Sequence, residues 1–88
     1  MFCMTDFNDF IELVHATRDK QLLADLFTGI TTDKERREFA RRLEVIRRLL
    51  DNEAQAKIAS DLGVGIATVT RGSKELAQGR FKVLRKMS

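Results

Sequence analysis

The chain has 88 residues, a net charge of +3, one cysteine (Cys3) and one histidine (His15), which suits one small domain over residues 1–88. These counts exclude an internal disulfide and a cysteine- or histidine-rich metal site, and they leave no nucleophile–base pair for an enzyme. No apolar run is long enough to cross a membrane, and the start lacks a signal peptide, so we expect a cytoplasmic protein that begins at Met1 or Met4.

Charge is unevenly distributed along the chain. Residues 1–30 carry more acidic than basic side chains, whereas residues 71–88 carry six Lys or Arg against Glu75 alone. A basic segment of this kind is typical of a protein with a polyanionic partner such as nucleic acid. A solvated basic tail explains the same composition equally well, so the charge pattern leaves both interpretations open.

The hydrophobic pattern predicts an all-α fold, because nothing alternates with a period of two and the chain has no proline. The first helix is expected over residues 6–16. Its apolar stripe is formed by Phe7, Phe10, Ile11 and Val14. A second helix is expected from Lys20 to about Thr28, where Gly29 ends it as a left-handed cap.

A third, longer helix is predicted from Thr32 to about Asp51. Thr32 and Glu35 form a capping-box pattern at its start. Its inward-facing side chains are expected to be Phe39, Leu43, Ile46, Leu49 and Leu50. The paired arginines are expected to form a solvated face, stabilised by the spacings Glu38–Arg42 and Glu44–Arg48.

Residues 54–76 carry the pattern of a helix-turn-helix. Counting from Gln55, Ala59 is the small residue where two steeply crossing helices come closest, and Gly63 occupies the turn position that needs a positive φ. Apolar residues fill the angle between the helices at Ile58, Leu62, Val64 and Val69. A phosphate-binding interpretation of "GVG" fails, because such a loop needs a preceding strand.

The second helix of such a motif enters the DNA major groove, and its first residues reach base edges. This placement predicts base contacts from Gly65, Ile66, Ala67, Thr68 and Thr70. Contacts to phosphates or base edges are expected from Gln55 and Lys57, with further backbone contacts from Arg71, Ser73 and Lys74. One unit binds weakly, so we expect a symmetric dimer on two half-sites of double-stranded DNA.

Gly72 stands at the eighteenth motif position, where an apolar residue normally seals the second helix onto the core. Its absent side chain leaves a hole beside Arg71, whose planar cation can stack on a ring or bind a carboxylate. The alternative is that the helix ends at Gly72. Leu76 continues the apolar stripe and Gly79 is a better stop, followed by a short helix over residues 80–87, but both interpretations stay open.

The string "LGVGIATVTRGSKEL" closely resembles the hallmark segment of the bacterial Trp repressor family, and "TDKERREFARRLEVIRRLL" resembles the helix before it. The resemblance covers about residues 6–87. It implies an intertwined all-α homodimer of six-helix subunits, with residues 6–51 as the dimerisation core. It also implies a sequence-specific transcriptional repressor whose affinity for operator DNA is raised by L-tryptophan as co-repressor.

The same resemblance implies a ligand site. The indole would lie between Arg71 of one subunit and Arg42 of the other, with space provided by Gly72. The remaining implied ligand residues are Thr32 for the carboxylate, Thr68 and Val45 as lining, the loop carbonyls from Gly29 to Thr31 for the ammonium group, and Glu75, which replaces the usual serine. The turn "DNEAQAK" is one residue shorter than usual. A ligand-independent or other-ligand helix-turn-helix regulator, or an interaction module without a DNA role, are the alternatives.

Overall fold

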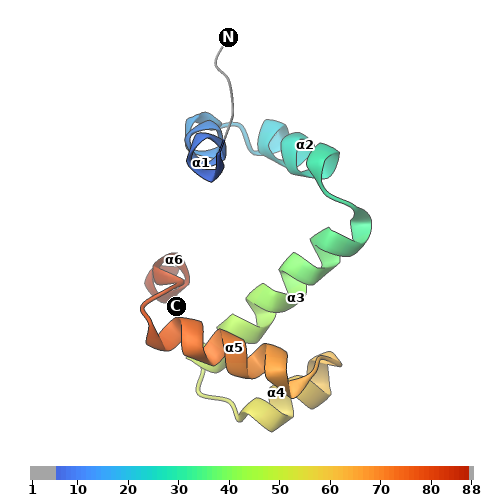
Figure 1. The fold of residues 1–88 in the computed structure, drawn as a ribbon, viewed down its shortest axis with the longest axis vertical. Helices are drawn as coiled ribbons and strands as arrows, with labels where there is room; N and C mark the ends of the chain where they lie inside the picture. The colour runs from blue at the N-terminus through green and yellow to red at the C-terminus, as the bar shows by residue number, and fades with distance from the viewer. Residues whose placement is uncertain (1–5, 88) are drawn as a thin grey trace. The chain divides into compact units, whose positions relative to one another are not determined.

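The computed structural model describes residues 6–87, which form six helices and no strand (Figure 1). The helices are α1 (Phe7–Ala16), α2 (Lys20–Ile30), α3 (Asp33–Leu50), α4 (Gln55–Leu62), α5 (Ile66–Ala77) and α6 (Lys82–Met87). The predicted all-α class is therefore confirmed. The expectations for Cys3 and for the starting methionine lie outside the described residues. Among the described helices, none is both long and apolar enough to span a bilayer.

The chain divides into two compact units, the first ending at Arg36 and the second beginning at Arg37. In the first unit, α1 and α2 are joined by an edge-to-face contact between Phe10 and Phe27, with ring centroids 5.6 Å apart. Asp6 and Asp19 cap these helices, accepting hydrogen bonds from the backbone N–H groups of Asp9 at 2.9 Å and Gln21 at 2.8 Å. Side-chain capping thus fixes where both helices begin.

The predicted end of the second helix was wrong. Gly29 lies inside α2, which continues to Ile30 and ends on Thr31 in an extended conformation (φ −125°). No left-handed residue is needed, because side chains satisfy the last carbonyls. The Thr31 hydroxyl donates to the Phe27 carbonyl, and Arg36 Nη1 donates to the carbonyls of Thr28 at 3.0 Å and Thr31 at 2.7 Å.

The capping box at the start of α3 is confirmed. The Glu35 N–H donates to the Thr32 hydroxyl at 3.1 Å, and the Thr32 N–H donates to the Glu35 carboxylate at 2.8 Å. These bonds lower the pKa of Glu35, the backbone bond from Thr32 contributing most. The helix therefore starts where the sequence pattern placed it.

The second unit contains the helix-turn-helix, and its core lies where α3, α4 and α5 meet. Val45, Ile58 and Val69 are buried together. Four partly buried side chains pack against them: Leu49, Ala59, Leu62 and Val64. Gly63 is left-handed (φ 65°, ψ 34°) and lets α5 turn back beside α4 (Figure 1). The predicted motif is confirmed at each of these positions.

Two predicted core residues of α3 are not buried in this chain. Phe39 is 44% exposed and Leu43 is 50% exposed, whereas Val45 and Ile46 are almost fully buried. The difference arises because α5 packs on the later turns of α3, against Val45, Ile46 and Leu49. Part of the apolar face of α3 therefore stays open to solvent.

Left-handed residues end both long helices of this unit. After α5, Gly79 has φ 91°, and the Arg80 N–H donates to the Glu75 carbonyl at 3.0 Å, as in a Schellman motif. The predicted stop at Gly79 is thereby confirmed. After α3, Asn52 adopts φ 61° and the Glu53 N–H donates to the Arg48 carbonyl at 3.2 Å. Asparagine tolerates this conformation better than most residues.

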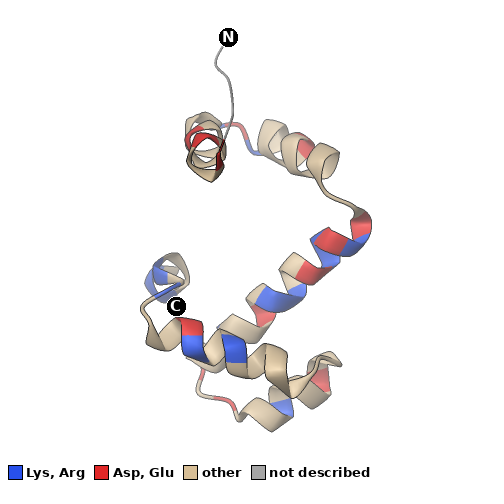
Figure 2. Cartoon of the chain, viewed as in Figure 1, with Lys and Arg blue, Asp and Glu red and all other residues tan. Residues whose placement is uncertain are grey.

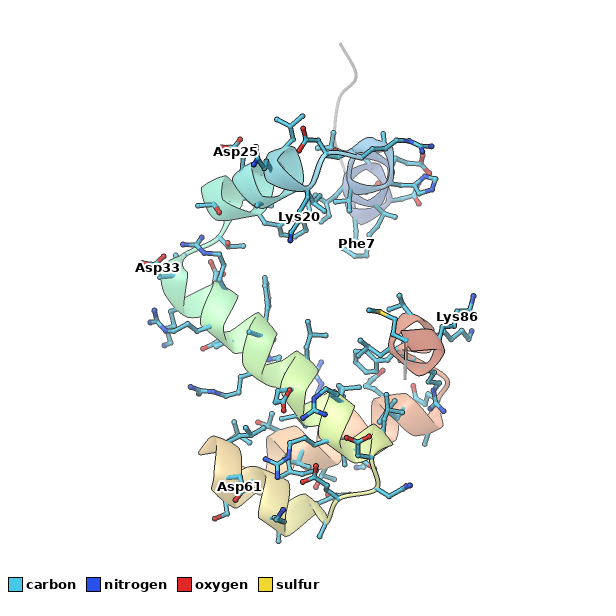
Figure 3. The ribbon with its side chains drawn as sticks, turned by 180° about the vertical axis from the view of Figure 1, so that it is seen from behind. Phe7, Lys20, Asp25, Asp33, Asp61 and Lys86 are labelled. Atoms are coloured by element: carbon cyan, nitrogen blue, oxygen red, sulfur yellow. The ribbon has the colours of Figure 1, made fainter. Side chains whose placement is uncertain are left out.

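Arg48 does not belong to a solvated face. Its side chain is 11% exposed and joins α3 to α4, with Nε donating to Glu53 at 2.8 Å and Nη2 donating to Asp61 at 2.6 Å. Asp61 is labelled on α4 in Figure 3. The predicted pair Glu44–Arg48 is replaced by Glu44–Arg47 at 2.6 Å, whereas Glu38–Arg42 is present at 3.9 Å. Arg48 thus holds the helix-turn-helix against α3.

The Arg48 cluster predicts acid sensitivity. Hydrogen bonds from Arg48 are the main cause of the lowered pKa of both Glu53 and Asp61. A carboxylate with a lowered pKa in the folded state stabilises the fold above its unfolded pKa, and this contribution is lost as the pH falls through the folded value. We expect the free energy of unfolding to decrease below about pH 4, and the Arg48→Met variant to show a shallower decrease. Urea unfolding at several pH values measures this, and parallel curves for the two proteins contradict it.

Candidate functional site

A hollow of about 720 Å³ opens in the second unit between α3, α5 and the residues that follow α5. Six of the nine predicted ligand residues line it: Arg42, Val45, Thr68, Arg71, Gly72 and Glu75. Its other lining residues are Phe39, Leu43, Ile46, Arg80 and Phe81. The volume falls within the usual range of small-molecule sites. The walls are mainly apolar, with charged groups at few points.

Three arginines line this hollow, Arg42, Arg71 and Arg80, of which Arg80 is paired with Glu75. Within the described residues, no carboxylate lies within ion-pair distance of Arg71, and Arg42 reaches Glu38 only at 3.9 Å. Such cations can bind a carboxylate through paired hydrogen bonds or stack on a flat ring. The resemblance implied an Arg42 from the other subunit, whereas here Arg42 and Arg71 of one chain line the same hollow.

Glu75 already has a partner in the hollow. Its Oε2 lies 3.3 Å from Nε of Arg80, and its side chain is 33% exposed. Glu75 lines the hollow as predicted, whereas Arg80 and Phe81, which were not predicted at the site, line it from the segment after the helix stop. The signal that points to Arg80 is its spacing from Glu75: a left-handed residue at Gly79 folds the next residue back over the last turn of α5.

Gly72 plays a different part from the one predicted. The helix does not end there, since α5 continues to Ala77. Nor does the missing side chain simply leave a hole toward the core. A Cβ at this position would lie 2.9 Å from Ile46 Cδ1, 3.5 Å from Leu49 Cδ1 and 3.6 Å from Val45 Cγ1. Glycine therefore allows α5 to approach α3 closely, while its backbone also borders the hollow.

The three other predicted ligand residues lie in the first unit and do not line the hollow. Gly29 is inside α2, Thr31 caps that helix, and Thr32 is held in the capping box. Their roles toward a ligand stay predictions. Among the described residues, no group of three or more His, Cys, Asp or Glu side chains is arranged to hold a metal ion.

The predicted DNA-contacting residues lie at the start of α5 and on α4. Gly65 is the N-cap of α5, and Ile66, Ala67 and Thr68 are exposed at its first turn. Further along, Arg71 and Lys74 are also exposed, and Ser73 is half-buried. Basic side chains continue from α5 into α6, where the labelled Lys86 projects outward (Figures 2 and 3).

Three of the predicted DNA-contacting residues make contacts within the protein. Thr70 donates a hydrogen bond to the side-chain carbonyl of Gln55 at 3.0 Å, which leaves the Gln55 amide as a donor. Lys57 lies 3.7 Å from Glu53 and 3.9 Å from Asp61. Gln55 is thus oriented by the second helix of the motif, and the charge of Lys57 is partly balanced.

A helix-turn-helix with exposed small and polar residues at the start of its second helix defines a class of DNA-binding regulatory proteins. The comparisons specify the family. The Trp repressor protein family matches residues 5–87, so the chain belongs to the Trp repressor family. It is accordingly a transcriptional repressor and not an enzyme.

Curated relatives agree with this assignment. A Trp operon repressor homolog from Vibrio campbellii is 40% identical over 72 residues, covering 81% of this chain and 72% of that protein. A homolog of the same description from Chlamydia trachomatis is 40% identical over 68 residues, covering 76% of this chain and 72% of that protein. The family match over residues 5–87 includes both the helix-turn-helix and the helix before it.

Proposed function

We propose that L-tryptophan is the co-repressor of this chain and that it binds in the hollow between α3 and α5. The observation that carries the proposal is the pair Arg42 and Arg71 on opposite helices of an apolar-walled hollow that Gly72 borders. A flat indole suits the apolar walls and the guanidinium faces. Arg71, which has no carboxylate partner within the described chain, suits the ligand carboxylate.

Glu75 provides the complementary charge for the ammonium group of the ligand. In this structure the carboxylate pairs with Arg80, at 3.3 Å. A ligand ammonium joins this pair beside Arg80, and an exposed ion pair of this kind is worth only about 0–1 kcal/mol. Rearrangement of the pair is therefore a small cost for a zwitterionic ligand.

The position of the hollow connects ligand binding to DNA binding. Its walls come from α3, which carries the core, and from α5, the helix expected to enter the major groove. Arg42 and Thr68 also line a smaller hollow, of about 220 Å³, next to the turn residues Gly63 and Gly65. A ligand that contacts both helices favours one orientation of α5, so ligand and operator each increase the affinity for the other.

A homodimer contains two copies of this hollow and of α5. Each unit of the chain leaves large apolar side chains exposed, among them Phe7 at 74% and Leu22 at 61% in the first, and Leu43 at 50% in the second. A second copy that covers these surfaces explains the exposure, and a two-fold dimer presents two recognition helices to two half-sites. The predicted cytoplasmic location follows from the need to reach chromosomal DNA.

We expect the chain to bind one DNA sequence preferentially only when L-tryptophan is present. The full chain is incubated with a library of random-sequence duplexes, with and without 1 mM L-tryptophan, and the recovered sequences are compared. A palindromic site enriched only with ligand supports the proposal, and ligand should raise affinity for that site at least about tenfold, a coupling free energy of about 1.4 kcal/mol. The same site enriched equally without ligand contradicts the co-repressor role and favours a ligand-independent regulator.

A further inference from the structure

The segment between α5 and α6 contains a strained residue. Phe81 has φ 64°, in the left-handed region that bulky side chains rarely adopt. Gly79, two residues earlier, has φ 91° without the same cost. If this junction only had to turn the chain, glycine or asparagine at position 81 would do so with less strain. A strained backbone that persists at a binding site is a reason to look for a function of its side chain.

Several bonds on both sides hold Phe81 in this conformation. On the α5 side, Arg80 is fixed by its backbone bond to the Glu75 carbonyl at 3.0 Å and by its ion pair with the Glu75 side chain at 3.3 Å. On the α6 side, Arg85 Nη2 donates to the Leu76 carbonyl at 2.8 Å, and the Leu84 N–H donates to the Phe81 carbonyl at 3.0 Å. These bonds keep Phe81 at the edge of the hollow.

Phe81 adds an aromatic wall to the hollow. It is half-buried and does not belong to the cluster of Val45, Ile58 and Val69. The hollow thus combines phenyl rings from α3 (Phe39) and from the α5–α6 junction with the planar cation of Arg71. Aromatic pairs and cation–ring contacts favour flat aromatic partners beyond the gain from buried area alone.

We propose that Phe81 is a specificity-determining residue of the hollow, which favours a flat aromatic occupant over an aliphatic amino acid of similar size. This inference rests on the proposed function, because it concerns the same hollow. The strain at Phe81 is then explained by the ring that it places in the wall, and Glu75 and Arg80 act as positioning residues for that wall.

The test compares Phe81→Gly, Phe81→Leu and the control Lys86→Ala, all in the full chain. Lys86 lies on the exposed side of α6 and does not line the hollow (Figure 3). The chain contains no tryptophan and no tyrosine, so the fluorescence of added L-tryptophan or indole reports binding without an indole or phenol background. Affinity for L-leucine, measured by calorimetry, gives the selectivity.

Phe81→Gly should weaken L-tryptophan binding about 5- to 10-fold, or about 1.0–1.4 kcal/mol, while leaving L-leucine affinity within about twofold, since the variant loses an aromatic contact that only a flat ring makes. Its thermal midpoint should not fall, because glycine relieves the strain. Phe81→Leu keeps apolar volume and should lose most of the selectivity, and Lys86→Ala should match the wild type.

The outcomes separate this inference from the proposed function. If the wild type binds indole but not L-tryptophan, the proposed function fails, and a loss of indole affinity in Phe81→Gly still supports the role of Phe81. If the wild type binds L-tryptophan and both Phe81 variants keep its affinity and selectivity, the role of Phe81 is overturned. A wild type that binds neither compound overturns both proposals.

Discussion

Replacement of Arg71 by glutamine is expected to weaken L-tryptophan binding about 10- to 100-fold. Arg71 lines the hollow and has no carboxylate partner within the described chain. Its guanidinium is therefore free to form charge-assisted hydrogen bonds with the ligand carboxylate, which contribute about 1.5–3 kcal/mol. Glutamine keeps a polar planar group of similar reach but removes the charge and the fork of donors.

The measurement is a titration of L-tryptophan by calorimetry, in the absence of DNA, so that contacts of Arg71 with phosphates do not enter. Arg37→Gln is the matched control, because Arg37 is an exposed arginine on α3 that does not line the hollow. We expect the control to bind as the wild type does. Equal losses in the two variants would point to a general effect of charge, and an unchanged Arg71→Gln would remove Arg71 from the site.

Substitution of Gly72 by leucine is expected to destabilise the fold by up to about 2 kcal/mol, in addition to impairing ligand binding. The new Cβ would lie 2.9 Å from Ile46 Cδ1, so the end of the Ile46 side chain must shift, and the rest of the leucine side chain needs further space between α3 and α5. Overpacking costs about 1–3 kcal/mol, and the gain of about 1 kcal/mol from removing a glycine in a helix offsets part of it. Urea unfolding followed by circular dichroism measures the change.

A double variant identifies the contact responsible. Ile46→Val removes Cδ1, the atom closest to the new side chain, and alone costs about 0.5–1.5 kcal/mol. Combined with Gly72→Ala, it should cost less than the sum of the two single changes. Gly29→Ala is the control, since a Cβ at Gly29 meets nothing within 4 Å and the substitution should stabilise α2 by up to about 1 kcal/mol. If the free-energy changes of the two single variants are additive, contact with Ile46 does not limit the size of the side chain tolerated at position 72.

The local pattern of the sequence was enough to predict the helices and the helix-turn-helix. Ala59, Gly63 and the apolar residues around them must satisfy the close crossing of two adjacent helices, and these requirements act over a few residues. The capping box at Thr32 and the stop at Gly79 are local in the same way. The ligand residues were predicted from the family resemblance, because the spacing of residues along one helix does not specify a hollow between two helices.

The sequence by itself determined which segments are helical, where most of them begin and end, and which pair forms the helix-turn-helix, since these depend on neighbours within about one or two turns. Only the tertiary structure decided how Gly72, Arg48 and Phe81 are used. Each depends on a partner from another element: Ile46 for Gly72, Asp61 for Arg48, and the hollow for Phe81. The physical reason is that side-chain packing between helices depends on the distance at which they meet, which is a property of the assembled fold.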